Sequence, residues 1–214
     1  MAARVKLRLD EPPYFESTPI FCCLRKETED ALRGLPRVYQ RSVAALRFLQ
    51  QMDNPTLVSD EDREIMQVAY LRAALMEFVA MEEVLQRDLG ERGFDEKQLK
   101  MEETENAMLI LLRELRHLQL HIVTTTFARE NRPAVYGEGE SRVEITFKIS
   151  IVPSSDLHEI KQLKNAKRYD PAELDAAINW LNEAQLNWGI GDVLQRGIQA
   201  YADLVINRYH LPAP

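Results

Sequence analysis

Cysteine is scarce in this chain: its 214 residues include 2 Cys, at the adjacent positions Cys22 and Cys23. A disulfide between neighbours is strained and no third cysteine is present, so a disulfide framework is excluded. Glycine and proline, at 8 and 10 residues, are too few for a fibrous or low-complexity chain. A chain of this length buries roughly 70% of its unfolded surface without metal or disulfide staples. We therefore expect a globular protein in a reduced, cytoplasmic setting.

Long hydrophobic runs are also missing. The longest apolar stretch, Ala107–Leu112, has six residues, whereas a membrane-spanning helix needs about 20. The stretch Met1–Leu9 alternates charged and aliphatic residues and contains no signal-peptide core. We expect neither membrane insertion nor secretion by that route.

Acidic charge is concentrated in one block. Of the formal net charge of −7, residues 51–107 hold 6 basic and 15 acidic side chains, while residues 108–150 hold 6 and 5. Broad, sequence-independent nucleic-acid binding depends on clustered Lys and Arg. The charge therefore excludes a phosphate-coating surface, but it allows a small enclosed site in the nearly neutral stretch.

Apolar residues recur at spacings of three and four through much of the first half of the chain. One run, flanked by a serine N-cap and a closing glycine, predicts a helix over 59–89. A second run over 32–52 predicts a helix that begins or kinks at Pro36. A third predicts a helix over 95–122. Three long helices joined by short turns favour an antiparallel bundle over 26–125.

The period changes to strict alternation over Arg142–Ile151, which is typical of a half-buried strand. Candidate partner strands are Ile122–Phe127, which is rich in β-branched residues, and the alternating Arg4–Leu9. The stretch Arg129–Ser141 contains Gly and Pro and is too long for a tight hairpin, so we expect a loop there. Region 126–153 should thus form a loop and a small antiparallel sheet.

The C-terminal region, 154–210, returns to helical patterning. We expect a short helix over 156–165, a helix that opens at Asp170–Pro171, and a last helix over 191–209. Taken together, the sequence predicts a single α+β, mainly α domain over 1–214. It comprises a long-helix antiparallel bundle, a small antiparallel sheet and a C-terminal helical subdomain.

Most catalytic signatures are absent, including phosphate-binding glycine loops, nucleophile elbows and zinc-protease motifs. One polar helix face remains. At about 100° per residue, it gathers Arg113, Glu114, Arg116, His117 and His121 on one side of the third helix. The opposite side is an apolar core stripe, formed by Leu111, Leu115, Leu118 and Ile122.

The stretch from Arg116 to His121, Arg-His-Leu-Gln-Leu-His, resembles the Arg-x4-6-His motif of the HEPN superfamily, helical proteins that include RNA-cleaving toxins and abortive-infection factors. The resemblance implies that these residues of two protomers, or of two domains, meet across a helical interface and cleave RNA without a metal or cofactor, and we expect a homodimer. It implies that His121 is the acid/base at the ribose 2′-hydroxyl and that Arg116 stabilises phosphoryl charge, chemistry that suits both side chains. His117 occupies the motif's polar second position, and Arg113 becomes a candidate substrate-binding residue.

Two metal sites are alternatives. The pair Glu114 and His117 has the spacing found in di-iron bundles, although the chain has no second Glu-x-x-His. The acidic residues on the preceding helix that could join it are Glu77, Glu82 and Glu83. His117 and His121 have a spacing that could hold Zn²⁺, but no third ligand is identifiable. A purely structural interpretation is that this face pairs with the acidic neighbouring helix.

Two functions therefore stand at this point. One is a metal-independent endoribonuclease of a defence or toxin–antitoxin type, which requires Arg116 and His121 to be exposed in one cleft. The other is a non-enzymatic cytosolic helical domain that binds a protein partner. The second function predicts an exposed apolar patch on the helix over 191–209.

Overall fold

The computed structural model describes residues 4–9, 23–53, 60–95, 97–121, 128–136 and 143–211. Within these residues, seven α-helices make up most of the chain, which confirms the mainly α class. The helices are α1 (Lys26–Leu32), α2 (Pro36–Asp53), α3 (Asp60–Glu91), α4 (Ala107–His121), α5 (Ser154–His158), α6 (Pro171–Trp188) and α7 (Ile190–Arg208). Short 3₁₀ helices are η2 (Met101–Thr104), η4 (Glu159–Gln162) and η5 (Lys164–Arg168), and two strands are β1 (Ala128–Tyr136) and β2 (Val143–Ile151).

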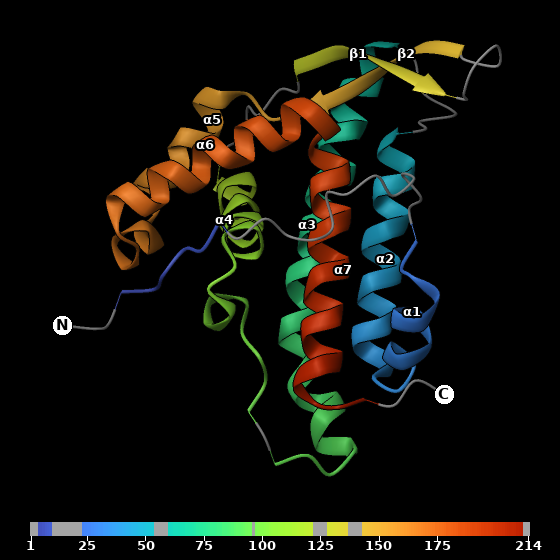
Figure 1. Ribbon diagram of the computed structural model, residues 1–214, viewed down its shortest axis with the longest axis vertical. Coiled ribbons are helices and arrows are strands. Elements are labelled where there is room, and N and C mark those ends of the chain that lie inside the picture. The colour runs from blue at the N-terminus through green and yellow to red at the C-terminus, as the bar shows by residue number, and fades with distance from the viewer. Residues whose placement is uncertain are drawn as a thin grey trace.

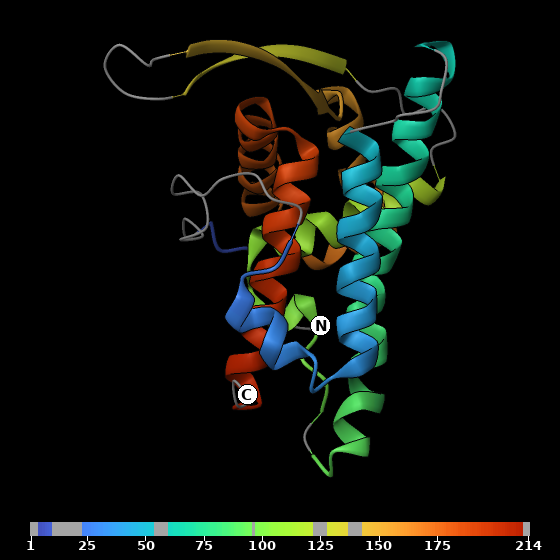
Figure 2. The same cartoon turned by 90° about the vertical axis from the view of Figure 1, so that its right-hand side faces the viewer.

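Helix α7 forms the centre of the bundle. It runs beside α2 and α3 (Figures 1 and 2), and it also packs against α1, α4 and α6. Of its 19 residues, 13 are buried, because other helices pack against most of its surface, and the buried polar residues Asp192 and Arg196 pair with each other. The exposed apolar patch predicted on 191–209 is therefore wrong. This helix is the core of the bundle and not the surface of a separate C-terminal subdomain.

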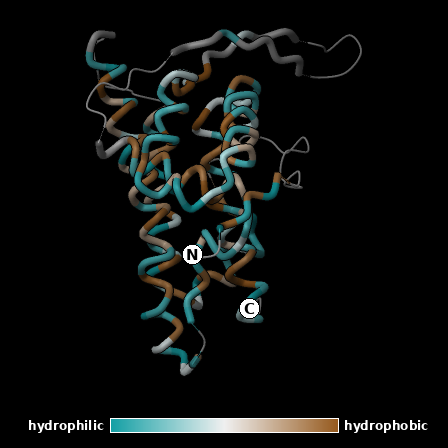
Figure 3. Tube along the Cα trace, turned by 90° about the vertical axis from the view of Figure 1, so that its left-hand side faces the viewer, coloured by the Kyte–Doolittle hydropathy of each residue, from teal (hydrophilic) through white to brown (hydrophobic). Residues whose placement is uncertain are grey.

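Helices α4 and α7 approach closely at Gly197. A Cβ atom at this position would overlap the Leu112 side chain, so only glycine permits the crossing without a shift of its neighbour. The predicted core stripe of α4 is confirmed at Leu111, Leu115 and Leu118, which are all buried. Hydrophobic and hydrophilic stretches alternate along the helices (Figure 3), as expected when each helix buries one side.

The helix predicted over 95–122 begins only with α4, so its predicted start is wrong. Side chains of α3 and α7 bind the backbone of the preceding segment, in which η2 is the only helical part that the structure describes. The Glu82 carboxylate accepts the Met101 N–H at 2.6 Å, and the Tyr201 hydroxyl donates to the Leu99 carbonyl at 2.7 Å. These tertiary contacts satisfy backbone groups that a helix would otherwise pair. The other two long helices match their predictions. Helix α3 begins and ends within two residues of its predicted bounds. Helix α2 begins at Pro36, one of the two predicted possibilities, and ends within two residues of its predicted end.

Strand β2 occupies the alternating segment, and its partner is β1. The two pair antiparallel, from Ala128 opposite Ile151 to Tyr136 opposite Val143. The loop predicted over 129–141 is therefore wrong for its first part, since the proline there lies in a strand with a free edge, where it is tolerated. The predicted partner Arg4–Leu9 does not pair with β2 and makes single bridges to other segments. The other predicted partner, 122–127, lies outside the described residues.

The hairpin lies across one end of the bundle (Figure 1), and the end of β2 anchors it. Ile149 and Ile151 are buried. The Gln185 side chain of α6 accepts the Val152 N–H at 2.9 Å and donates to the Val152 carbonyl at 2.6 Å. Gly189, at φ 82°, joins α6 to α7 beside Ile149. This junction fixes the position of the hairpin relative to the core.

Candidate functional site

The predicted site residues lie along two successive turns of α4. The structure brings Arg116 and His117 together, with Arg116 Nη1 3.4 Å from His117 Nδ1. Both side chains are half-buried. His121 is the last residue of α4, and its side chain lies outside the part of the chain that the structure describes. Helix α4 thus presents an arginine and a histidine next to each other near its C-terminal end.

Arg116 has few partners for a half-buried cation. Its side chain is 19% exposed, and among the described residues the nearest carboxylate oxygen, Oε1 of Glu83 on α3, lies 4.0 Å from Nη2. Its Nε atom is buried without a hydrogen-bond partner. A guanidinium can only donate, so a hydrogen bond between the two side chains requires the imidazole Nδ1 to accept. The arrangement leaves donor capacity on Arg116 for an anion.

Arg113, one turn earlier, has a structural partner. Its Nη1 donates to Glu102 Oε2 at 3.1 Å, and Arg168 Nη1 of η5 lies 2.7 Å from the same oxygen. Arg168 first, and then Arg113, hold the pKa of the Glu102 carboxyl below its usual value. Arg113 therefore ties η2 to α4 at the place where the sequence predicted a substrate-binding residue.

Glu114 is buried and serves the fold in the same way. It accepts the Tyr169 hydroxyl at 2.8 Å and the Asn165 side-chain amide at 3.3 Å. Burial, and then the Glu114 carboxylate, raise the pKa of Tyr169. Glu114 thus anchors η5 and the segment that follows it to α4.

The carboxylates of the di-iron alternative are not brought together. Glu77 pairs with Arg41 of α2 at 2.8 Å, Glu82 accepts a backbone N–H of η2, and Glu114 accepts Tyr169. Burial raises the pKa of Glu82, against the opposing effects of the Met101 N–H and Arg113. Among the residues described, no group of three or more His, Cys, Asp or Glu side chains is placed to hold a metal ion.

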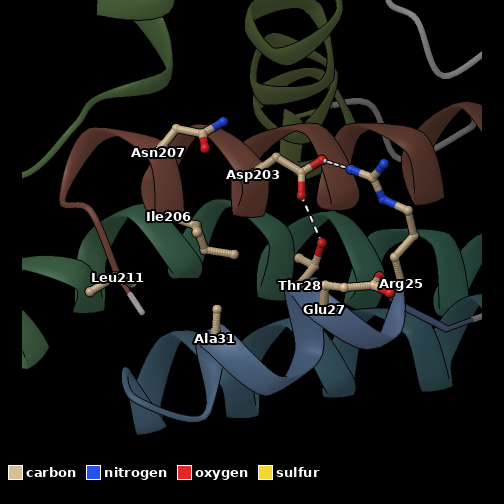
Figure 4. A pocket seen from close by; sticks show the side chains of 8 residues that line it. All are labelled: Arg25, Glu27, Thr28, Ala31, Asp203, Ile206, Asn207 and Leu211. Atoms are coloured by element: carbon tan, nitrogen blue, oxygen red, sulfur yellow. Dashed lines mark hydrogen bonds and ion pairs between the residues drawn. The ribbon is translucent and has the colours of Figure 1, made fainter. Parts of the chain in front are cut away.

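Sequence reasoning missed a polar pocket of about 390 Å³ between α1 and the end of α7 (Figure 4). Arg25 forms an ion pair with Asp203 there, Thr28 donates to the same carboxylate at 2.7 Å, and Gln199 donates to Thr28 at 2.7 Å. The two sides are more than 170 residues apart in sequence, so no local pattern could reveal the pocket. Its polar groups bind one another, and they dock α1 onto α7.

A second missed cluster is a buried ion pair within α7. Arg196 Nε donates to Asp192 Oδ2 at 2.5 Å, and the guanidinium lies 5.0 Å from the Trp188 ring centroid. Burial raises the pKa of Asp192, and Arg196 opposes that shift. The spacing of four residues on a helix is the signal that could have predicted this pair.

Comparison with protein-family models, curated proteins and solved structures found no match for this chain. Among the helices that the structure describes, none combines the length and apolar character needed to cross a bilayer.

Proposed function

We propose that this protein is a metal-independent endoribonuclease whose site lies at the C-terminal end of α4. The observation that carries the proposal is the placement of Arg116 3.4 Å from His117, with the nearest carboxylate among the described residues 4.0 Å away. A half-buried guanidinium that is not neutralised at close range is suited to bind phosphate. An adjacent imidazole can move a proton near neutral pH.

The reaction that these groups could perform is cleavage by the RNA's own 2′-hydroxyl. A histidine removes the proton from this hydroxyl, and the 2′-oxygen attacks the adjacent phosphorus. The bond from phosphorus to the 5′-oxygen breaks, and that oxygen takes up a proton from a second acid. The products are a 2′,3′-cyclic phosphate and a free 5′-hydroxyl. Arg116 stabilises the negative charge that develops on the phosphoryl oxygens.

The roles of the individual residues follow the HEPN resemblance. His121 is the proposed acid/base, and Arg116 is the proposed phosphate-binding residue. His117 contacts Arg116 and is the second candidate for proton transfer. RNA, a homodimeric partner, a cytoplasmic setting and a role in defence or toxin–antitoxin biology are part of the same proposal.

The alternative function, a non-enzymatic protein-interaction domain, depended on an exposed apolar patch over 191–209. That segment is the buried helix α7. The contact between Arg116 and His117 supports the site on α4. No corresponding observation on α7 supports an interaction domain, because most of that helix is buried.

An RNA-degradation assay on the full chain tests the proposal. The wild type should cleave single-stranded RNA in the presence of EDTA, and His121→Ala should abolish cleavage. His158→Ala is the matched control, because His158 is an exposed histidine on α5 whose ring contacts only the Ser154 carbonyl in its own helix. This variant should cleave at the wild-type rate.

Two outcomes contradict the proposal. One is a wild-type protein that degrades no RNA from a panel of unstructured and hairpin substrates. The other is an activity that His121→Ala leaves unchanged, since the cleavage then comes from elsewhere in the protein or from a contaminant. Identification of the product ends tests the chemistry separately, because a 2′,3′-cyclic phosphate requires attack by the 2′-hydroxyl.

A further inference from the structure

The N-terminal residues 4–9, blue in Figure 1, form an extended strap that joins η5 to the start of α4. At one end of the strap, the Val5 N–H donates to the Arg168 carbonyl of η5 at 2.9 Å. At the other end, the Arg8 carbonyl accepts the Ala107 N–H of α4 at 3.0 Å. Two segments from opposite halves of the chain therefore lie side by side.

The strap turns its apolar and basic residues to opposite sides, as alternation in an extended segment requires. Leu7 is buried, whereas Arg4, Lys6 and Arg8 are exposed. The two arginines each pair with a carboxylate at 2.8 Å. Lys6 has no carboxylate partner among the residues that the structure describes. The strap thus presents one uncompensated positive charge beside η5.

The lysines of η5 lie on one exposed side of this 3₁₀ helix, in which side chains three residues apart eclipse each other. One such pair, Asn165 and Arg168, faces the bundle. Asn165 donates to a carboxylate of α4 at 3.3 Å, and Arg168 pairs with a carboxylate of η2 at 2.7 Å. The neighbouring pair, Lys164 and Lys167, is exposed and has no carboxylate partner in the described part of the chain.

The strap and η5 together form a basic surface. Its cations are Arg4, Lys6, Arg8, Lys164, Lys167 and Arg168. The carboxylates beside it are engaged, because three pair with the arginines and that of Glu173 accepts the Leu7 N–H at 3.1 Å. Three lysines therefore remain for a ligand. Lys and Arg gathered on one surface are the mark of phosphate binding, and on a chain of net charge −7 this surface is local.

The basic surface adjoins the α4 site. Glu114 of α4 holds η5 and the residue after it through their hydrogen bonds to its carboxylate, and His117 lies one turn further along the same side of α4. Arg168 of η5 shares a carboxylate with Arg113, which lies one turn before Arg116. A strand bound at Arg116 by one phosphate can extend its neighbouring nucleotides over η5 and the strap.

We propose that the strap and η5 form an RNA-binding surface, where Lys6, Lys164 and Lys167 contact phosphates next to the one cleaved at α4. The choice of RNA rests on the proposed function, whereas the basic surface does not. Lysine binds phosphate as a point charge and carries no base recognition. An anionic membrane fits less well, because membrane-binding surfaces need a row of apolar side chains, and the strap exposes Leu9 as its one large apolar residue.

Binding of an uncleavable oligonucleotide to the full chain tests the surface. The probe is a fluorescein-labelled RNA of about 20 nucleotides, 2′-O-methylated throughout so that it lacks the attacking hydroxyl. Lys6→Gln/Lys164→Gln/Lys167→Gln should flatten the slope of log affinity against log salt by about 2, because each phosphate contact of a single strand contributes about 0.7. Lys6→Arg/Lys164→Arg/Lys167→Arg keeps the charges and should bind like the wild type.

The matched control is Lys26→Gln/Arg47→Gln/Lys97→Gln. It removes the same charge from exposed residues of α1, α2 and the segment between α3 and η2, so it should keep the wild-type slope. Circular dichroism spectra should be unchanged in all three variants, because every replaced side chain is exposed.

Four results would overturn the proposal. They are a wild type that does not bind the probe at about 50 mM salt, a triple glutamine variant of the basic surface with the wild-type slope, a control variant that loses as much slope, and binding to phosphatidylserine vesicles but not to the probe. A protein that binds the probe but cleaves no RNA would support the basic surface and contradict only the α4 function.

Discussion

Two successive turns of α4 each carry an arginine beside a second polar residue, and the two arginines have different surroundings. In the first turn, Arg113 donates to Glu102, and Glu114 accepts Tyr169. In the next turn, Arg116 contacts His117 and lies 4.0 Å from an exposed glutamate of α3. This difference shows that residue type and helix face do not determine whether a charged side chain is paired within the protein or can bind a ligand. The neighbouring segments decide it.

The neighbours of the two turns differ for a reason visible in the topology. The segments η2 and η5 cover the first turn, and they bring Glu102, Arg168 and Tyr169 against it. Among the residues that the structure describes, the carboxylate closest to Arg116 is that of Glu83 on α3, whose side chain is 62% exposed. A buried polar group without a partner costs free energy, so the covered turn needs paired side chains. The partly open turn can keep donor capacity for a ligand.

The largest effect should come from breaking the covered turn. Glu114→Ala leaves the buried Tyr169 hydroxyl and the Asn165 amide without their acceptor. We expect it to lower the free energy of unfolding by about 3 kcal/mol, measured by urea denaturation.

The control for this variant is Glu183→Ala. Glu183 is an exposed residue of α6, and its replacement should change the free energy of unfolding by less than about 0.5 kcal/mol. Equal stability of the two variants would mean that the covered turn is not held by its polar contacts.

A smaller effect should appear in the pH dependence of the free energy of unfolding, to which two carboxylates of the covered region contribute with opposite sign. Burial raises the pKa of Glu82, so its contribution to stability is full below its unfolded pKa and is lost as the pH rises through the folded pKa. Arg168 and Arg113 lower the pKa of Glu102, so its contribution is present above its unfolded pKa and is lost as the pH falls through the folded pKa.

Urea denaturation of Glu82→Gln and Glu102→Gln between about pH 3 and pH 7 checks both signs. Relative to the wild type, Glu102→Gln should be least stable at neutral pH and should approach the wild type in acid. Glu82→Gln should improve relative to the wild type as the pH rises. Parallel pH profiles for the two variants would contradict the assignment of opposite shifts.

Local patterns predicted much of the helical structure. The periodic run over 59–89 became α3, Pro36 begins α2, and Asp170 caps α6 by accepting the Ala172 N–H at 2.9 Å. These features depend on the residue and its near neighbours along the chain, which is why a single sequence reveals them. The alternating residues of β2 were recognised for the same reason.

Features that depend on distant residues were not predictable. The start of α4 moved because Glu82 and Tyr201 bind the preceding backbone. The burial of α7 follows from helices contributed by the whole chain. For the site, the helix face and the adjacency of Arg116 and His117 could be predicted from spacing. The pairing of Arg113 with Glu102 could not, since it depends on how the segment between α3 and α4 folds back.

The comparison of Arg113→Gln with Arg116→Gln tests the central claim most directly, by measuring both RNA cleavage rate and free energy of unfolding. We expect Arg116→Gln to stay within about 0.5 kcal/mol of the wild-type stability and to lose cleavage by at least about 100-fold. Arg113→Gln should lose about 1 kcal/mol of stability and cleave at the wild-type rate while folded. An Arg116→Gln variant that cleaves RNA as fast as the wild type would contradict the account.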